Sequence, residues 1–312
     1  MGVRIFIDGK EGTTGLRIYD RLEGRPEVSL LTLPEDRRKD PAARRECLHE
    51  ADVAILCLPD AAARESVALA GGSRVRILDT STAHRVESGW VYGFPELSAH
   101  HRQAVAEGAR VAVPGCHASG FIALASPLVQ AGFLPEDAHL SCFSLTGYSG
   151  GGRKMIAEYQ AAERSPALDS PRQYGLSQGH KHLPEMRKVC GLNHAPAFSP
   201  IVSSYYAGME VVVSLFGQDV QGSLEDVKAA YRSCYTGALV QYVEAPDEKG
   251  FLSASQLAGY DHMQISVFGN EERILLVSRF DNLGKGASGA AIQNMNLVLG
   301  LDETTGLTLP VE

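Results

Sequence analysis

Short apolar runs alternate with amphipathic stretches through the first 115 residues of the chain. Such runs predict buried strands, and they lie at residues 3–8, 28–33, 51–59, 75–79 and 111–113. Helical spacing follows several of them, for example along residues 16–22 and 61–70. Alternating strands and helices are typical of a parallel sheet that carries helices on both faces. We therefore expect an α/β domain with a Rossmann-type, doubly wound parallel sheet over residues 1–115.

The pattern changes after residue 115, where apolar and polar positions alternate along the predicted strands. This alternation indicates strands with one exposed face, at residues 139–146, 209–216, 263–268 and 273–280. Helices are expected near residues 153–163, 183–189 and 224–235. These elements predict an α+β domain over residues 116–283, built on a mixed, largely antiparallel sheet. The last predicted helix, residues 288–299, is rich in small residues, and the segment 284–312 is expected to complete the first domain.

The composition is that of an ordinary globular protein, with 44% hydrophobic and 21% charged residues among 312. A net charge of −8 argues against a nucleic-acid partner, because binding a phosphate backbone requires a basic surface. No apolar run approaches the length of a membrane span, and the run between Arg4 and Asp8 is too short for a signal peptide. We therefore expect a cytoplasmic protein that has no membrane partner.

Cysteine usage points to one reactive thiol rather than to disulfides. The six cysteines are scattered without CxxC spacing, which predicts reduced thiols. Cys116 alone follows a predicted strand and a Pro114-Gly115 turn, and helical spacing begins directly after it. The first turn of a helix presents unpaired backbone N–H groups and the positive end of the dipole, which favour a thiolate and can stabilise an oxyanion. Cys116 is therefore the predicted nucleophile, and a buried structural cysteine is the alternative.

A glycine-rich turn directly follows the first predicted strand and precedes the first helix. This order is the phosphate-binding arrangement of dinucleotide folds. The spacing is GxxGxxG rather than the commoner GxGxxG, and an ordinary tight turn is the alternative. The predicted cofactor-binding residues of this turn are Gly9, Gly12, Thr13, Thr14 and Gly15.

The loop after the second predicted strand bears on the choice between NAD and NADP. An acidic residue there usually holds the ribose hydroxyls of NAD, whereas the 2′-phosphate of NADP requires basic groups. Glu35 and Asp36 keep NAD open, but the three successive cations Arg37, Arg38 and Lys39 favour NADP. The alternative is a solvated charged loop with no ligand.

Two stretches of the second domain carry residues suited to catalysis. Residues 146–153 hold four glycines before Arg153; glycine lets a backbone approach a ligand, and arginine can bind a carboxylate. Residues 179–185 place His180 and His182 just before a predicted helix, and histidine moves protons near neutral pH. The alternatives are a flexible turn with an exposed arginine, and surface histidines. A zinc site would need a second ligand cluster, so we expect no metal.

These stretches and Cys116 together resemble the N-acetyl-γ-glutamyl-phosphate reductase family in its shorter, type 2 form. The likeness covers nearly the whole chain. His117 and Gly151 depart from the longer form, which usually has tyrosine after the cysteine and SGAGR in the glycine loop. The matching motifs are IFIDGKEGTTGL at 5–16, LDTSTAHR at 78–85, YGFPEL at 92–97, VPGCHASG at 113–120, GYSGGGR at 147–153, GHKHLPEM at 179–186 and DNLGKGASGAAIQNMN at 281–296.

The resemblance implies a reaction and roles for these residues. NADPH would reduce N-acetyl-γ-glutamyl phosphate to N-acetylglutamate 5-semialdehyde through a thioester on Cys116, a step of arginine biosynthesis. One histidine of His180 and His182 would be the acid–base, and the related aspartate-semialdehyde dehydrogenases favour His182. The further predicted residues are Ser81 and Arg85 for the leaving phosphate, Arg153 for the substrate carboxylate, Ser149 and Glu185 for other substrate contacts, and Asn282 and Lys285 near the nicotinamide.

Two other functions fit the same residues. A related acyl-phosphate reductase, acting on aspartyl phosphate or an aminoadipyl derivative, would share the cysteine and the nucleotide turn. A regulatory protein could keep the NADP-binding fold without catalysis, since fold alone does not prove activity. In each case we expect a closed homo-oligomer, either a dimer or a tetramer.

Overall fold

The computed structural model describes residues 2–10 and 12–310, which divide into two compact units. Unit 1 comprises the chain up to Pro95 together with His100–Pro114 and Ala287–Leu307. Unit 2 comprises Glu96–Ala99, Gly115–Gly286 and the residues from Thr308 onward. Glu11 of the predicted glycine-rich turn, and the predicted domain ends at residues 1, 311 and 312, lie outside the described residues.

Unit 1 is built on a six-stranded sheet in which every described pairing is parallel. The chain leaves β1 for an edge strand and then crosses over to the other side of β1. The carboxyl end of β1 is therefore the point where the strand order reverses, and doubly wound sheets bind ligands at this point. The strands in spatial order are β2 (Val28–Leu31), β1 (Val3–Asp8), β3 (Val53–Leu56), β4 (Arg76–Asp79), β6 (Arg110–Ala112) and β5 (Val91–Tyr92).

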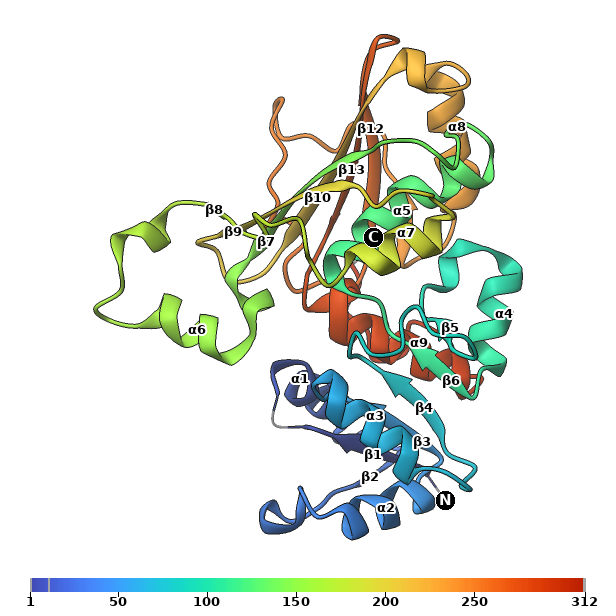
Figure 1. Ribbon diagram of the computed structural model, residues 1–312, viewed down its shortest axis with the longest axis vertical. Helices are drawn as coiled ribbons and strands as arrows, with labels where there is room; N and C mark the ends of the chain where they lie inside the picture. Colours follow the sequence, from blue (N-terminus) through green and yellow to red (C-terminus); the bar gives the residue numbers. More distant parts are fainter. Residues whose placement is uncertain (1, 11, 311–312) are drawn as a thin grey trace. The chain divides into compact units, whose positions relative to one another are not determined.

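Helices cover both faces of this sheet (Figure 1). One face buries Ile5 and Ile55 against Ile18 of α1 and Ile292 of α9. The other face buries Phe6 and Leu56 together with side chains of α2 and α3. The predicted doubly wound α/β class is therefore confirmed. The helices are α1 (Thr13–Leu22), α2 (Pro41–Glu50), α3 (Asp60–Leu69), α4 (Ala99–Glu107) and α9 (Gly289–Val298).

Unit 2 contains a seven-stranded mixed sheet, as the alternating pattern predicts. β7 pairs with β9 and β11 with β12 in parallel, and the other pairings are antiparallel. The strands in spatial order are β11 (Val240–Tyr242), β12 (Met263–Gly269), β13 (Arg273–Phe280), β10 (Met209–Phe216), β7 (Ser141–Gly147), β9 (Ala197–Ser203) and β8 (Arg172–Gln173).

The long helix α5 (Cys116–Gln130) lies on one face of this sheet. At Gly120 of α5, a Cβ atom would lie 2.4 Å from Val211 of β10 and 2.8 Å from Ser278 of β13, so glycine allows close helix–sheet packing. The opposite face leaves the large apolar side chains Phe143, Phe216 and Leu275 exposed. The other helices are α6 (Gly152–Gln160), α7 (Leu183–Cys190) and α8 (Leu224–Cys234), and in Figure 1 the segment with α6 stands away from α8.

The two units divide the chain differently from the predicted domains. The predicted first domain includes residues 96–99 and all of 284–312, whereas only Ala287–Leu307 of the final segment belongs to unit 1. Near the end of the chain, Thr308 N–H donates to Asp261 Oδ2 at 2.8 Å, and Asp261 N–H donates to the Thr308 carbonyl at 2.8 Å. These bonds attach Thr308 to unit 2.

Candidate active site

The predicted nucleophile lies in the first turn of a helix. α5 begins at Cys116, and the carbonyl of the preceding Gly115 accepts a hydrogen bond from Ser119 N–H at 2.8 Å. No side chain caps this helix start and no acidic residue lies in its first turn, so the backbone N–H groups and the positive dipole end are presented near the thiol. Cys116 is partly exposed, whereas burial raises the pKa of the Cys142 and Cys190 thiols. The structure therefore sets Cys116 apart from these core cysteines.

A glycine that the sequence analysis did not single out lies against the nucleophile. Gly286 belongs to a π-helical turn, Gly284–Ser288, that directly precedes α9. A Cβ atom at Gly286 would lie 3.0 Å from Cys116 Cβ and 3.1 Å from the Asp281 carbonyl oxygen, closer than ordinary van der Waals contact. Single π-helical turns occur frequently at functional sites. Glycine at position 286 therefore allows this turn to pack against Cys116.

The two residues predicted near the nicotinamide make contacts within unit 2. Lys285 Nζ donates a hydrogen bond to Glu96 Oε1 at 2.7 Å, and the lysine is almost fully buried. Asn282 Nδ2 donates to Ser149 Oγ at 3.0 Å, and Asn282 Oδ1 accepts from Gly208 N–H at 2.9 Å. These bonds connect the segment before α9 to the glycine-rich loop and to the start of β10.

Three histidines gather next to the nucleophile. The ring centroids of His117 and His180 lie 5.5 Å apart, those of His117 and His182 lie 5.6 Å apart, and those of His180 and His182 lie 4.7 Å apart. The sequence analysis predicted His180 and His182 but not His117, although its position directly after Cys116 was a signal for it. The structure therefore brings both predicted histidines to the first turn of α5.

Two of these histidines are held neutral. Burial, followed by the charges of His180 and Lys181, lowers the pKa of His117 to about 3. Burial and the nearby Lys181 lower the pKa of His180 to about 4. His180 Nδ1 also accepts a hydrogen bond from the backbone N–H of His182 at 3.2 Å, which fixes the proton of the neutral ring on Nε2.

Glu185 connects the histidine segment to the nucleophile turn. It lies in the first turn of α7 and is only 1% exposed. Its Oε2 atom accepts a hydrogen bond from Gly115 N–H at 3.2 Å, one residue before Cys116. Glu185 therefore contacts the backbone that carries the nucleophile.

The glycine-rich loop places its two predicted residues differently. Ser149 is buried and accepts the hydrogen bond from Asn282 described above. Arg153 is exposed in the first turn of α6, after Gly152, whose φ of +73° is a conformation that glycine adopts without strain. The exposed guanidinium of Arg153 is accessible to an anionic ligand. Ser149 instead holds the side chain of Asn282.

The glycine-rich turn of unit 1 borders a pocket at the carboxyl end of β1. Gly9, Lys10, Gly12 and Asp8 line a cavity of about 580 Å³. A Cβ atom at Gly9 would lie 2.5 Å from the Cys57 carbonyl, and one at Gly15 would lie 2.5 Å from the Gly9 carbonyl. Both glycines are therefore required by close backbone packing. α1 begins with Thr13 and Thr14, and Gly12 is its N-cap residue. Because no side chain caps the helix, its first backbone N–H groups are available to bind a phosphate.

A buried ion pair neutralises the only acidic group of β1 that faces this pocket. Arg44 of α2 donates to Asp8 Oδ2 from Nε at 3.2 Å and from Nη2 at 3.1 Å, and Ser66 donates to the same oxygen. At the carboxyl end of β1, a phosphate would therefore meet a carboxylate that is already paired. The glycine cradle, the uncapped helix and this neutralised carboxylate fit the pyrophosphate of a dinucleotide.

The cations after β2 separate into two groups. Arg38 and Lys39 line the pocket together with Glu35 and Thr32. Arg37 instead forms ion pairs with Asp40 at 3.5 Å and Glu46 at 3.9 Å. Two of the three predicted cations therefore line this pocket, where Arg38 also forms an ion pair with Glu35 at 3.7 Å, and their binding of a 2′-phosphate stays a prediction.

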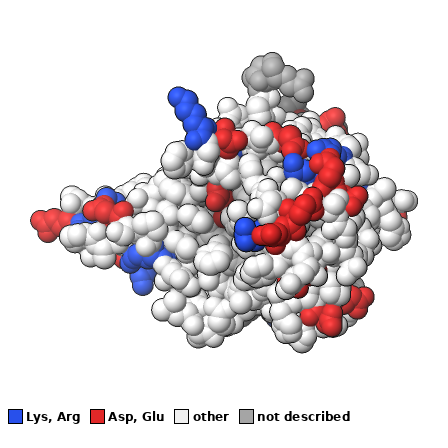
Figure 2. Space-filling view, turned by 90° about the horizontal axis from the view of Figure 1, so that it is seen from above, with Lys and Arg blue, Asp and Glu red and all other residues white. Residues whose placement is uncertain are grey.

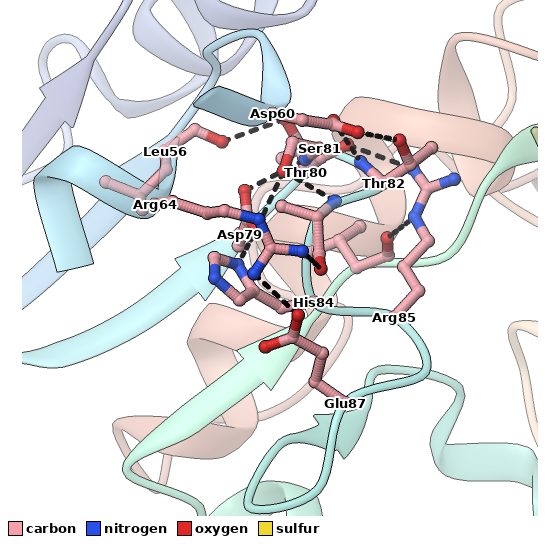
Figure 3. A network of polar contacts seen from close by, with 12 residues as sticks. Leu56, Asp60, Arg64, Asp79, Thr80, Ser81, Thr82, His84, Arg85 and Glu87 are labelled. Atoms are coloured by element: carbon pink, nitrogen blue, oxygen red, sulfur yellow. Dashed lines mark hydrogen bonds and ion pairs between the residues drawn. The ribbon is translucent and has the colours of Figure 1, made fainter. Parts of the chain in front are cut away.

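The loop after β4 is stabilised by its own polar side chains (Figure 3). Ser81 Oγ donates to Asp79 Oδ2 at 2.8 Å, and His84 Nδ1 lies 2.6 Å from the same oxygen. Arg85 donates from Nε to the Val113 carbonyl and from Nη2 to the Thr80 carbonyl, both at 2.9 Å. The two residues predicted to bind the leaving phosphate thus take part in holding this loop, and the structure connects them to the segment that precedes Cys116.

The described residues contain neither a metal-ligand cluster nor a helix that could span a membrane. Among residues 2–10 and 12–310, no group of three or more His, Cys, Asp or Glu side chains could hold a metal ion. In the same part of the chain, no helix has both the length and the apolarity to span a membrane. On the face that Figure 2 shows, acidic and basic side chains are interspersed.

Comparison with known proteins identifies the class to which this fold and site belong. Residues 116–282 match the family model of the semialdehyde dehydrogenase dimerisation domain, and residues 38–105 match that of the semialdehyde dehydrogenase NAD-binding domain. The solved aspartate semialdehyde dehydrogenase II of Vibrio cholerae, complexed with ASA, superposes with a TM-score of 0.73 at 15% identity, covering 96% of this chain and 99% of that one. The enzyme from Candida albicans, solved with NADP, gives a TM-score of 0.67 at 16% identity, covering 96% and 99%. The fold is that of the semialdehyde dehydrogenases.

Curated relatives define the family more closely. The N-acetyl-gamma-glutamyl-phosphate reductase of Rhizobium meliloti is 46% identical over 308 residues, covering 96% of this chain and 99% of the relative. The N-acetyl-gamma-glutamyl-phosphate reductase 2 of Pseudomonas putida is 43% identical over 311 residues, covering 97% and 98%. The chain belongs to the N-acetyl-γ-glutamyl-phosphate reductase family, which confirms the resemblance drawn from the sequence motifs.

Proposed function

We propose that this protein uses NADPH to reduce N-acetyl-γ-glutamyl phosphate to N-acetylglutamate 5-semialdehyde and phosphate, a step of arginine biosynthesis. The observation that carries the proposal is the partly exposed Cys116 at an uncapped helix start, with three histidine rings beside it. An identity of 43–46% over 96–97% of the chain to reductases of this substrate favours it over the aspartyl-phosphate enzymes, which match at 11–16% identity.

The thiol of Cys116 would perform the first chemical step. Its thiolate attacks the acyl carbon, the C–O bond to the phosphate breaks, and phosphate leaves as a thioester forms on Cys116. The backbone N–H groups of the first turn of α5 are available to stabilise the oxyanion of the tetrahedral intermediate. Covalent catalysis thereby divides one difficult reduction into two easier steps.

The second step is the reduction of the thioester on Cys116. The glycine-rich turn, Arg38 and Lys39 would bind NADPH, which would supply the hydride for this reduction. The resulting thiohemiacetal loses its hydroxyl proton, the C–S bond breaks, and the semialdehyde leaves while the Cys116 thiolate is regenerated. Hydride addition and collapse both require a group that can hold and release a proton.

We assign this proton transfer to His182 rather than His180. The lowered pKa of about 4 keeps His180 neutral at physiological pH, and its Nδ1 already accepts the His182 backbone N–H. His182 is buried beside His117, and the first turn of α7 that follows it carries Glu185, which binds the backbone next to Cys116. The predicted roles of Arg153 at the substrate carboxylate and of Ser81 and Arg85 at the phosphate stay predictions, which KM measurements on single variants test.

We also propose a cytoplasmic homo-oligomer. Unit 2 matches a family model described as a dimerisation domain. The sheet face opposite α5 exposes Phe143, Phe216 and Leu275, and exposed apolar patches of this kind mark interaction surfaces. A second copy of the chain, which carries the same apolar face, would cover it by two-fold symmetry.

The direct test is the reverse reaction, followed as NADPH formation. We expect phosphate-dependent reduction of NADP with N-acetylglutamate semialdehyde, and slower turnover with aspartate semialdehyde. The Cys116→Ser variant should lose at least about 1000-fold in kcat, because a serine hydroxyl is not ionised at neutral pH. Its affinity for NADPH, measured by fluorescence, should stay within about twofold because unit 1 is unchanged. Unchanged turnover of Cys116→Ser would instead support the non-catalytic NADP-binding alternative.

A further inference from the structure

A short chain of hydrogen bonds runs from the core of unit 2 to the edge of the proposed active site. His117 Nδ1 lies 2.6 Å from Ser144 Oγ, and His117 Nε2 lies 2.7 Å from the Tyr174 hydroxyl. Ser144 on β7 is fully buried, His117 is 3% exposed, and Tyr174 is partly exposed. The chain of hydrogen bonds therefore begins at a residue that solvent does not reach and ends at a residue that is partly exposed.

The burial of Ser144 fixes the direction of these hydrogen bonds. The neutral ring of His117 has one nitrogen that donates and one that accepts. Among the described residues, His117 is the only hydrogen-bond partner of the Ser144 hydroxyl, and a buried hydroxyl donor without an acceptor is costly. Ser144 therefore donates to Nδ1, and the proton of the His117 ring lies on Nε2, which donates to the Tyr174 oxygen.

The Tyr174 oxygen consequently accepts from His117, and its own O–H remains to be donated. Burial and the charge of Cys116 raise the pKa of Tyr174, so the hydroxyl keeps its proton. No other hydrogen-bond partner of this hydroxyl lies in the described part of the chain. The Tyr174 ring centroid lies 5.9 Å from that of His180, within the histidine cluster.

We propose that Ser144 and His117 are positioning residues that hold the Tyr174 hydroxyl so that it donates a hydrogen bond to an oxygen of the acyl substrate. This inference rests on the proposed function. The substrate offers two oxygen acceptors of this kind, the departing phosphate and the acyl portion with its N-acetyl and carboxylate groups. Tyr174 is then a substrate-binding residue, and His117 determines which way its proton points.

The test uses the full-length protein in the reverse direction, where the KM values for phosphate and for N-acetylglutamate semialdehyde are measured separately. Tyr174→Phe removes only the hydroxyl, and it should raise one of the two KM values about 10-fold, the usual effect of losing one hydrogen bond to a polar or charged group. A rise in the KM for phosphate would show that the oxygen belongs to the phosphate, and a rise in the KM for the semialdehyde would show that it belongs to the acyl portion. Tyr242→Phe is the matched control, because the Tyr242 hydroxyl donates to Glu244 at an exposed position outside the histidine cluster.

Ser144→Ala separates the hydrogen-bond chain from a merely structural role. Without the serine donor, His117 can carry its proton on Nδ1 and accept from Tyr174, which turns the tyrosine proton away from the substrate. Ser144→Ala should therefore raise the same KM by about two- to fivefold, and add nothing when Tyr174 is already phenylalanine. Circular dichroism and the melting temperature check that each variant is folded.

Three results would overturn the proposal while the wild-type activity stands. They are unchanged KM values in Tyr174→Phe, a Ser144→Ala variant that behaves as wild type, and additive effects in the double variant. A wild-type protein without phosphate-dependent NADP reduction would instead refute the proposed function itself, so the two failures are distinguishable.

Discussion

At the scale of single residues, the neutral histidines link the active site to stability. His117 and His180 keep pKa values of about 3 and 4 when folded, and the ordinary value is about 6.5 in an unfolded chain. Between these values the unfolded state binds more protons than the folded state, so stability is lost as the pH falls below about 6.5. The loss continues until the folded rings themselves take up protons.

This linkage predicts an acid-sensitive fold. Lowering the pH from 7.5 to 5.5 should cost about 1 kcal/mol of unfolding free energy for the buried His117 and less for the more accessible His180. Urea unfolding at both pH values measures the cost, and His117→Gln should reduce it. His100→Gln, on the exposed surface of α4, is the control. A pH dependence that is identical in wild type and His117→Gln would contradict the prediction.

Gly286 gives a second prediction at this scale. Gly286→Ala places a Cβ atom 3.0 Å from Cys116 Cβ, so the thiol or the π-helical turn must shift. A shift of the nucleophile by a few tenths of an ångström should lower kcat about 10- to 100-fold, with a smaller effect on the KM values. Gly237→Ala is the matched control, because a Cβ atom there meets nothing within 4 Å. Equal kcat values for the two variants would show that the nucleophile tolerates the contact.

Single residues were predictable from the sequence where their chemistry is local. Cys116 was identified by the strand, turn and helix around it, and the glycine turn by its position after β1. Lys285 and Asn282 were predicted near the nicotinamide, but Lys285 bonds to Glu96, 189 residues away, and Asn282 bonds to Ser149, 133 residues away. Such partners depend on the tertiary fold, and no local pattern reports them.

At the scale of elements, one glutamine attaches the histidine segment to the sheet. Gln178 Nε2 donates to the Phe198 carbonyl at 2.7 Å, and its Oε1 accepts from Phe198 N–H at 2.8 Å. The side chain thus pairs with the edge of β9 as a neighbouring strand would. Gln178 has a φ of +56°, and it stands two residues before His180.

Removing this attachment should loosen the histidines without unfolding unit 2. Gln178→Ala should lower kcat about 10-fold, because the proton-transfer group loses its fixed position. Hydrogen exchange at the Phe198 amide should become faster in the same variant. Gln173→Ala is the control. Gln173 is exposed on β8, and this variant removes only the hydrogen bond from its side chain to Ser199. An unchanged kcat in Gln178→Ala would argue that other contacts position the segment.

The loop after β2 allows a test of cofactor choice. Arg38→Ala with Lys39→Ala removes both cations that line the pocket, and should lower kcat/KM for NADPH about 100-fold while leaving that for NADH nearly unchanged. Arg37→Ala removes a cation that pairs with Asp40 and Glu46 instead, and should have little effect on either. A strong loss in Arg37→Ala alone would move the 2′-phosphate site to that residue.

Elements with a clear apolar period were predictable, and those without one were not. β10 and β13 follow the alternating pattern, and both have the predicted bounds, Met209–Phe216 and Arg273–Phe280. α2 was missed because its buried face contains Arg44, which is bonded to Asp8, in place of an apolar stripe. β9 was missed because Pro200 interrupts a run that reads as a loop, although β7 and β8 flank it in the sheet.

At the scale of the whole molecule, the fold class follows from the order of strand and helix signals, but the division of the chain does not. The segment Ala287–Leu307 returns to unit 1 because α9 buries Ile292 and Met295 on the sheet face next to α1. Thr308 instead bonds to Asp261 and belongs to unit 2. The hydrophobic pattern predicts that the helix over Gly289–Val298 is buried, whereas the surface that buries it is set by the complete structure.

The exposed sheet face of unit 2 carries the last prediction. Phe143, Leu275 and Phe216 lie on the face opposite α5, with exposed fractions of 48%, 40% and 61%. A glutamate at position 275 would bring a charge into an interface formed by two copies of this face, and burying an unpaired charge is strongly unfavourable. Leu275→Glu should therefore lower the mass measured by light scattering to that of a smaller assembly or a monomer, while its fold is retained because the side chain already contacts solvent. Ala68→Glu, exposed on α3 of unit 1, should keep the wild-type mass. If the wild-type protein is itself a monomer at micromolar concentration, the homo-oligomer does not exist; if Leu275→Glu keeps the wild-type mass, the assembly uses another surface.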